Sequence, residues 1–132
     1  MSSIESPTAA ERDGLFKSFS RAWFRRDMDL LYSVVTADFQ WRNTDAAGLP
    51  TLIQGREAVG AALTGRAAGR TKAMINEVVY HHAPDATFMT FRVVESDKET
   101  GAVLRDEIGI ERYTFKDGRI TQKDIYRKPA GA

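Results

Sequence analysis

Asp124 is the residue whose type and position best suit acid–base chemistry. It lies in the alternating segment Gln122-Lys123-Asp124-Ile125-Tyr126. On a strand it would share a face with Ile120, Gln122 and Tyr126, and the apolar Ile120 indicates that this face points inward. Burial disfavours the charged form of a carboxylate, which moves its pKa toward the range used by general acids and bases. Asp124 is therefore our first catalytic candidate, and a cross-strand salt bridge to an arginine is the alternative.

Glu111 and Asn43 are the two candidate partners of Asp124. Glu111 would face the same cavity, together with its alternating neighbours Glu107, Gly109 and Tyr113. Two carboxylates in one cavity keep one of them protonated, whereas a solvated face would pair Glu111 with Arg92 or Arg105. Asn43 stands where a strand opens into a loop, so its amide is suited to donate to a carbonyl, an epoxide oxygen or a water. The alternative for Asn43 is a simple turn residue.

Large aromatic side chains would form the wall around these groups. We expect Phe19, Trp23, Trp41 and Tyr126 to contact a ligand, although tryptophans of this kind also serve as core residues. The chain also has enough bulk to fill its own cavity, through Trp23, Trp41, Phe88 and Tyr126. A pocket smaller than about 300 Å³ would favour that structural alternative.

The remaining composition excludes several other classes of protein. Lys and Arg number 19 against 18 Asp and Glu, so net charge does not favour nucleic acid or a membrane surface. His81 and His82 are adjacent and would point to opposite faces of a strand, so we predict no metal site, and nothing in the sequence calls for a cofactor. There is no cysteine, signal-like start or membrane-length apolar run, which makes the cytoplasm the expected location.

The elements that must position these residues begin with helices. Thr8 and Glu11 have the spacing of a capping box, and apolar residues then recur at helical intervals over 9–26. The basic residues of this helix are expected mostly on its solvated side; they are Arg12, Lys17, Arg21, Arg25 and Arg26. A short second helix runs through 30–35 after Asp27 or Asp29, and a third opens at Gly55 and stops at Gly65 or Gly69.

Strands follow these helices. Alternating residues predict a first strand over 38–43 and four more over 73–82, 87–96, 103–115 and 119–127, joined by short turns. The expected fold is α+β, a cystatin-like cone of three N-terminal helices packed on a curved, mostly antiparallel sheet. We expect one domain over 1–132, with 1–7 and 129–132 loose. Ile108, Ile110 and Ile125 would lie on the outer sheet face and pair two copies as a homodimer.

Four segments, in this order, resemble the nuclear transport factor 2-like superfamily. They are Arg26-Asp27-Met28-Asp29-Leu30-Leu31, Thr36-Ala37-Asp38-Phe39-Gln40-Trp41, Gly55-Arg56-Glu57-Ala58-Val59 and Phe115-Lys116-Asp117-Gly118-Arg119-Ile120. The superfamily includes ketosteroid isomerases, limonene epoxide hydrolases, SnoaL-like polyketide cyclases and non-catalytic binders. The resemblance therefore implies a fold and a pocket, and each known site has to be compared residue by residue.

The known sites match only in part. The ketosteroid isomerase positions hold Phe19, Asn43 and Glu111, which removes the tyrosine and the aspartate base, so we reject that activity. The epoxide hydrolase positions keep Asn43 and Asp124, with Trp41 in place of the tyrosine. The Arg-x-Asp pair of those enzymes reads Arg92-Val93-Val94 here, which lacks the acid but leaves Arg92 as a candidate ligand contact. SnoaL-like cyclases add a histidine on the strand before the last, which this chain does not have.

The resulting hypothesis is a cofactor-independent SnoaL-like isomerase, cyclase, lyase or hydrolase. Its substrate would be a small apolar cyclic or carbonyl-containing organic molecule. The alternative is a non-catalytic protein of the same fold that binds such a molecule and leaves it unchanged, because the acid–base set of each known site is incomplete.

Overall fold

Helix α1 (Ala9–Arg25) begins at the capping box that the sequence predicts. In the computed structural model, which describes residues 6–131, Glu11 N donates to Thr8 Oγ1 over 3.2 Å and Thr8 N donates to Glu11 Oε1 over 2.8 Å. These contacts satisfy two amides that would otherwise lack partners at the helix start. Residues 1–5 and 132, which belong to the predicted loose ends, lie outside the described residues.

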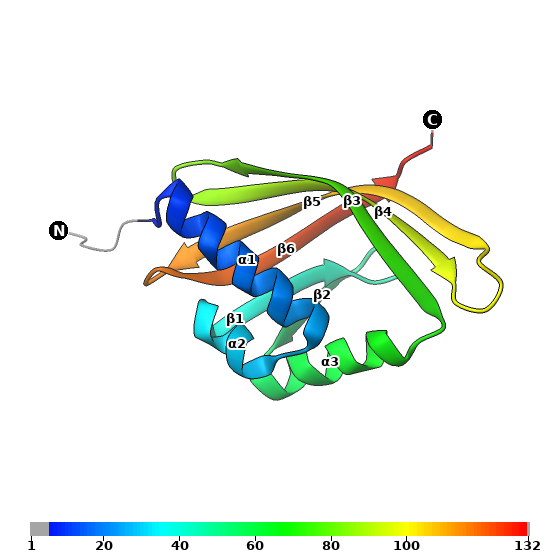
Figure 1. The fold of residues 1–132 in the computed structure, drawn as a ribbon, viewed down its shortest axis with the longest axis horizontal. Coiled ribbons are helices and arrows are strands. Elements are labelled where there is room, and N and C mark those ends of the chain that lie inside the picture. Colours follow the sequence, from blue (N-terminus) through cyan, green and yellow to red (C-terminus); the bar gives the residue numbers. More distant parts are fainter. Residues whose placement is uncertain (1–5, 132) are drawn as a thin grey trace.

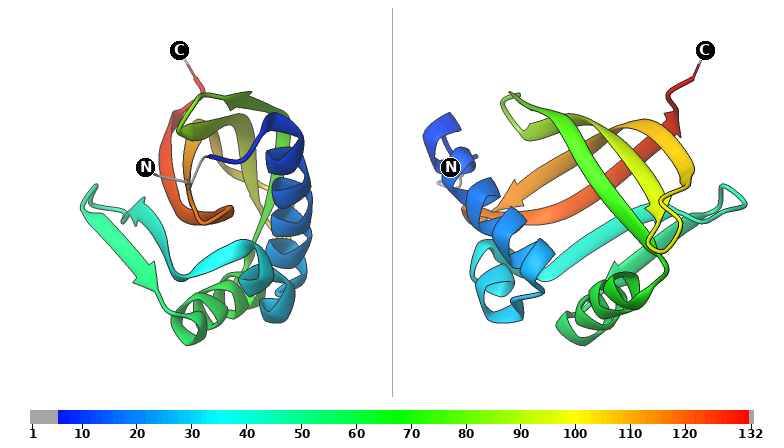
Figure 2. Two further views of the ribbon diagram at one scale, coloured as in Figure 1. Left: turned by 90° about the vertical axis from the view of Figure 1, so that its left-hand side faces the viewer. Right: turned by 45° about the vertical axis from the view of Figure 1, so that its right-hand side comes forward.

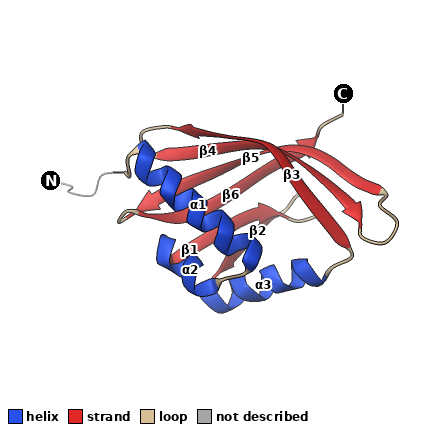
Figure 3. Ribbon diagram, viewed as in Figure 1, coloured by secondary structure: helices blue, strands red, loops and turns tan. Residues whose placement is uncertain are grey.

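Two shorter helices follow the predicted positions. Asp27 caps α2 (Met28–Val34) by accepting from Leu30 N, and α3 (Arg56–Ala68) begins after Gly55 and ends at Gly69. Helix α1 lies across one face of the sheet, while α2 and α3 lie along its edge near β1 and β2 (Figures 1 and 3). The helices therefore gather on one side, as an α+β fold requires.

Six strands form one sheet in the order β2-β1-β6-β5-β4-β3. Their bounds are β1 (Val35–Thr44), β2 (Pro50–Gln54), β3 (Thr71–His82), β4 (Ala86–Asp97), β5 (Val103–Lys116) and β6 (Arg119–Pro129). All neighbours are antiparallel except β1 and β6, which are parallel. The α+β class expected from the sequence is confirmed, whereas β2 and the parallel pair were not predicted.

Bulges bend the sheet around α1, as the two side views show (Figure 2). The register shifts between Asn76 and Val79 of β3, where Glu77 has a φ of 55°. It shifts again where Thr114 and Phe115 of β5 meet β6. Each shift adds a residue to one strand, which increases the local twist and lets a long sheet curl. The curled sheet and α1 enclose the core.

Candidate functional site

The concave side of the sheet holds a cavity of about 270 Å³ beneath α1. Most of its wall is apolar or aromatic, including Phe19, Trp23, Met89 and Ile125. The polar groups that line it are Ser20, Arg66, Tyr80, Glu111, Tyr113, Lys123 and Arg127. An apolar hollow with a few convergent polar groups is the usual form of a small-molecule site.

Glu111, Tyr113 and Lys123 form a contiguous cluster on this wall. Glu111 and Tyr113 are two residues apart on β5, so they project from the same face, and Lys123 lies directly across from Tyr113 on β6. The Tyr113 hydroxyl donates to Glu111 Oε1, and Lys123 Nζ lies 3.6 Å from the same oxygen. All three residues are at most 6% exposed. The second carboxylate oxygen, Oε2, has no hydrogen-bond partner among residues 6–131.

Burial controls the protonation of this cluster. Burial is the main cause that lowers the pKa of Lys123 to about 8; Arg66 and Arg127 contribute to this shift, and Glu111 opposes it. Burial also raises the pKa of Tyr113 well above its usual value, with the Glu111 charge acting in the same direction. At neutral pH the cluster therefore holds an ammonium group and a neutral phenol.

Aromatic rings support the Lys123 ammonium. Its Nζ lies 3.9 Å from the centroid of the Trp23 ring and 5.5 Å from that of Phe19. Cation–π contacts of this kind offset part of the free energy that an ammonium group loses when it is buried away from water. Because Glu111 supplies the only carboxylate within 4.0 Å of Nζ in residues 6–131, the remaining N–H groups are free for a ligand. The cluster can thus combine a base, a cation that stabilises negative charge and a phenol that orients the base.

Asp124, our first candidate from the sequence, does not face this cavity. In register it lies between Arg112 of β5 and Arg42 of β1 on the outer face, and its Oδ2 accepts from the Tyr126 hydroxyl over 2.8 Å. The assignment to the inner face was wrong because β6 has a bulge: Ile120 pairs with Phe115, but Gln122 already pairs with Thr114. The extra residue reverses the alternation after Ile120. Glu111 and Asp124 therefore do not form a carboxylate pair.

Three more candidates lie away from the inner cavity. Asn43 pairs with Thr51 of β2, and its Oδ1 accepts from Thr44 N over 2.8 Å. Arg92 is on the outer face, where it binds Asp106 through two nitrogens, at 2.9 and 2.6 Å. Tyr126, also on that face, is 56% exposed. Each of these side chains binds a local partner or lies on the outer face. The prediction that they line the cone was therefore wrong.

Phe19, Trp23 and Trp41 are brought together as the sequence suggested. Phe19 and Trp23 stack with their centroids 5.2 Å apart and line the cavity, and Trp41 packs edge-on behind Trp23 at 4.5 Å. Trp41 is 4% exposed, and its indole N–H has no hydrogen-bond partner in the described part of the chain. Trp23 is thus both core residue and cavity wall, whereas Trp41 supports it from behind.

The outer face has a wider hollow, of about 510 Å³, between β3 and β6. Its apolar residues include Ile108 and Ile110, but Ile125, expected here from the sequence, lies inside at 4% exposure. The bulge in β6 explains this error too. The hollow is an open groove. Arg92, which lines it, is already paired with Asp106 and lies 3.9 Å from Glu77 on the same wall. Its greater volume is not matched by reactive groups, so we place the candidate site in the inner cavity.

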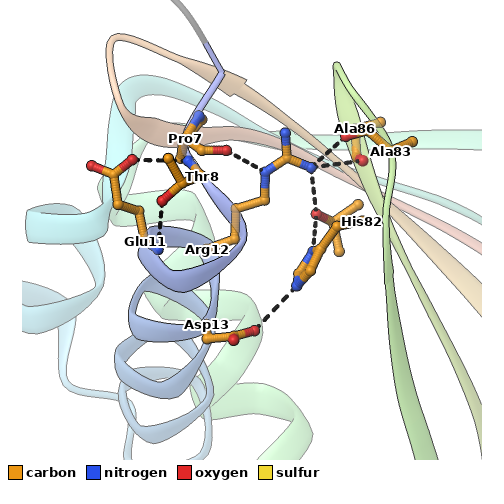
Figure 4. Close-up of polar contacts among 9 residues, drawn as sticks. Pro7, Thr8, Glu11, Arg12, Asp13, His82, Ala83 and Ala86 are labelled. Atoms are coloured by element: carbon orange, nitrogen blue, oxygen red, sulfur yellow. Dashed lines mark hydrogen bonds and ion pairs between the residues drawn. The ribbon is translucent and has the colours of Figure 1, made fainter.

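Arg12 is a buried exception among the basic residues of α1. Its guanidinium donates to the carbonyl oxygens of Pro7, Ala83 and Ala86, at 2.6 to 3.0 Å (Figure 4), and to that of Pro84 at 3.0 Å. These bonds tie the start of α1 to the β3–β4 hairpin. Arg12 is not solvated as predicted for this helix face, because carbonyl groups of two other segments replace water as its hydrogen-bond partners.

His82 stands between two groups in an arrangement similar to a nucleophile triad. Its Nε2 lies 3.1 Å from Asp13 Oδ1, and its Nδ1 lies 2.9 Å from Thr87 Oγ1 (Figure 4). Thr87 is 0% exposed, and its hydroxyl also accepts from Arg12. A nucleophile must reach its substrate, so these contacts serve the packing of the hairpin against α1.

Sequence reasoning missed Lys123, Tyr113 and Arg66. Lys123 and Ile125 alternate as regularly as Ile120 and Gln122, so either set was a valid inner face. The spacing of Glu111 and Tyr113, two apart beside a small Gly109, was a usable signal for one strand face. Nothing in the local pattern distinguishes Arg66 from other helix-surface arginines.

These features define a small α+β protein with a ligand-sized cavity between its helices and a curved sheet. The chain belongs to the SnoaL-like domain family, whose model matches residues 16–123. The resemblance drawn from the sequence is therefore confirmed at the level of family. No curated protein sequence gives a match. No helix within residues 6–131 is both long and apolar enough to cross a membrane.

Solved structures give the same fold. The chain is similar to an NTF2-like protein from Burkholderia xenovorans LB400, with a TM-score of 0.76 and 17% identity over 92% of both chains. It is similar to a proposed polyketide cyclase from Xanthomonas campestris pv. campestris, at 0.66 and 18%, over 89% of this chain and 90% of that one. It is also similar to an LEH-like epoxide hydrolase from M. tuberculosis, at 0.66 and 17%, over 92% and 86%. Identities this low show a shared fold alone.

Proposed function

We propose that this protein is a cofactor-independent enzyme that removes a proton next to a carbonyl group in a small organic molecule. Isomerisation, cyclisation and elimination all begin with this step. The observation that carries the proposal is the buried contact of Glu111, Tyr113 and Lys123 on the wall of a cavity. Tyr113 and Lys123 both have shifted pKa values, and such groups in a hollow are typical of active sites.

Each group has a separate role in this mechanism. Glu111 Oε2 takes the proton from the carbon next to the carbonyl, while Lys123 stabilises the negative charge that develops on the carbonyl oxygen. Tyr113 donates to Glu111 Oε1 and fixes the orientation of the carboxylate. The proton on Glu111 then returns to another position of the same molecule or leaves with a departing group. No external oxidant or reductant is needed for this sequence.

The cavity volume limits the substrate. About 270 Å³ accommodates a single ring or a short chain, and it lies below the limit of about 300 Å³ under which a filled, purely structural cone is expected. Volume alone therefore favours the structural alternative. The ionic cluster favours a site because replacing a buried ion pair with apolar residues commonly leaves stability unchanged or improves it.

The test is exchange of carbon-bound hydrogen in D₂O, followed by proton NMR on a panel of cyclic ketones. We expect the wild-type protein to accelerate exchange next to the carbonyl and Glu111→Gln to lose about 10²-fold or more of that rate. Asp124→Asn is the matched control on the outer face and should retain the rate. Exchange at the rate of buffer alone, combined with saturable ligand binding, would instead support the non-catalytic binder.

A further inference from the structure

The inner cavity shares a boundary with a second hollow. This vestibule, of about 350 Å³, lies between the ends of α1 and α3 and strand β3. Four residues line both spaces, namely Trp23, Phe24, Arg66 and Ala73. A molecule that enters the cavity through the vestibule must pass these side chains, so their chemistry selects what enters.

Arg66 differs from the other cations of the cavity because it has no carboxylate partner within 4.0 Å in the described part of the chain. Lys123 pairs with Glu111, and Arg127 lies 3.4 Å from Glu95 and 3.7 Å from Glu107. Within residues 6–131, the guanidinium of Arg66 makes no hydrogen bond and no ion pair. A guanidinium has five N–H donors, so all of them remain free for a ligand.

The surroundings of Arg66 also favour an incoming anion. Its guanidinium lies 5.5 Å from the centroid of the Trp41 ring. Partial burial is the main cause that lowers the pKa of Arg66, and repulsion from Arg127 lowers it further, whereas the charges of Glu95 and Glu111 act in the opposite direction. A negative group placed beside Arg66 would relieve both costs. Arginine binds carboxylates through two parallel hydrogen bonds, which also fixes the orientation of the ligand.

The vestibule itself is rich in positive charge. Arg26, Arg66 and Lys98 line it together with one carboxylate, Glu95, which already pairs with Arg127. Concave surfaces that carry charge of one sign raise the local concentration of the opposite ion. This arrangement would draw anionic molecules toward the mouth of the cavity.

We propose that the ligand of the inner cavity is a small oxo acid, whose carboxylate binds Arg66 at the mouth while its carbonyl oxygen reaches Lys123. This inference rests on the proposed function for the role of Lys123, and it adds the chemical class of the substrate. The apolar wall formed by Phe19, Trp23 and Ile125 contacts the carbon skeleton between the two polar ends.

Calorimetric titration with a matched pair of probes tests this proposal. The probes are 3-oxocyclohexane-1-carboxylate and its methyl ester, which share a ring and a ketone but differ in charge. We expect the wild-type protein to bind the acid about tenfold more tightly than the ester, as a charge-assisted hydrogen bond implies. Arg66→Gln should remove that preference. Arg56→Gln makes the same charge change at the other end of α3, outside both hollows, and should keep it.

The outcomes separate the two proposals. Equal binding of acid and ester, a preference that survives Arg66→Gln, or no binding of the acid at millimolar concentration would overturn the oxo-acid proposal. Exchange of neutral ketones that depends on Glu111 would leave the proposed function intact in each of those cases. An Arg66-dependent preference for the acid without any hydrogen exchange would support the anion site and overturn the proton-transfer mechanism.

Discussion

A carboxylate and a tyrosine two residues apart occur on both faces of the sheet, with different consequences. On β5 the Tyr113 hydroxyl donates to Glu111 two residues away, and on β6 the Tyr126 hydroxyl donates to Asp124 at the same separation. The first pair is at most 4% exposed, whereas Tyr126 is 56% exposed. Burial is the main cause that raises the pKa of Tyr113, while the hydrogen bond to Asp124 is the main cause for Tyr126.

This comparison shows that an acid and a tyrosine two apart on a strand do not make a reactive site by themselves. Water screens the charge of the outer pair, so the interaction of Asp124 with Tyr126 contributes little to the free energy of folding. The inner pair is shielded from water and lies beside Lys123. The interaction energy of each of these groups therefore depends strongly on the other two. If the comparison is sound, equivalent changes on the two faces should differ widely in effect.

The largest expected effect on stability is at the inner pair. Glu111→Gln should reduce the free energy of unfolding by about 3 kcal/mol, because it leaves the Lys123 ammonium buried without a carboxylate. Asp124→Asn should change it by less than about 0.5 kcal/mol. Urea denaturation of both variants at neutral pH measures the difference. The double variant Glu111→Gln/Lys123→Met should recover much of the loss, and a double variant less stable than Glu111→Gln would contradict this account.

The next largest expected effect is at Gly109 of β5, which lines the outer hollow. A Cβ at this position would lie 2.5 Å from Phe91 Cζ, whose ring crosses the strand there. Gly109→Ala should therefore cost about 1–3 kcal/mol through overpacking. Gly14→Ala is the matched control: a Cβ added at this helical position meets nothing within 4 Å among residues 6–131, so that change should stabilise the protein slightly. Equal thermal midpoints for the two variants would count against the packing described here.

The pH dependence should reveal Lys123. Its pKa falls from 10.5 to about 8 on folding, so between these values the folded protein has released a proton that the unfolded chain still holds. Stability from this group therefore rises as pH increases from about 8 to 10.5 and is lost as pH falls through about 8. Denaturation across this range should show the rise in the wild type and a smaller one in Lys123→Met. Parallel curves for the two proteins would refute the assigned shift.

The smallest expected effect on the stability of the folded chain is on the outer face. Ile108 and Ile110 are 40% and 43% exposed beside the outer hollow, and the homodimer expected from the sequence would cover them. Ile110→Lys should then turn a dimer into a monomer with little effect on folding. Light scattering after gel filtration gives the mass of each form. A wild-type monomer at high concentration would remove this prediction.

The sequence determined most elements and the class of the fold, because capping and periodicity are local properties. Thr8 with Glu11, Asp27 and Gly69 mark helix ends that the structure reproduces, and the four late strands match within a few residues. Local patterns also suggested Phe19 and Trp23 as cavity wall.

Only the tertiary structure decided which chemistry faces the cavity. One extra residue at the bulge of β6 placed Lys123 inside and Asp124 outside, and both assignments fit the alternation of the sequence equally well. The partner of Glu111 and the unpaired state of Arg66 depend on segments far apart in the chain, namely β5 with β6 and α3 with the sheet. Spacing within one segment carries no information about such contacts, because they arise when the sheet curls around α1.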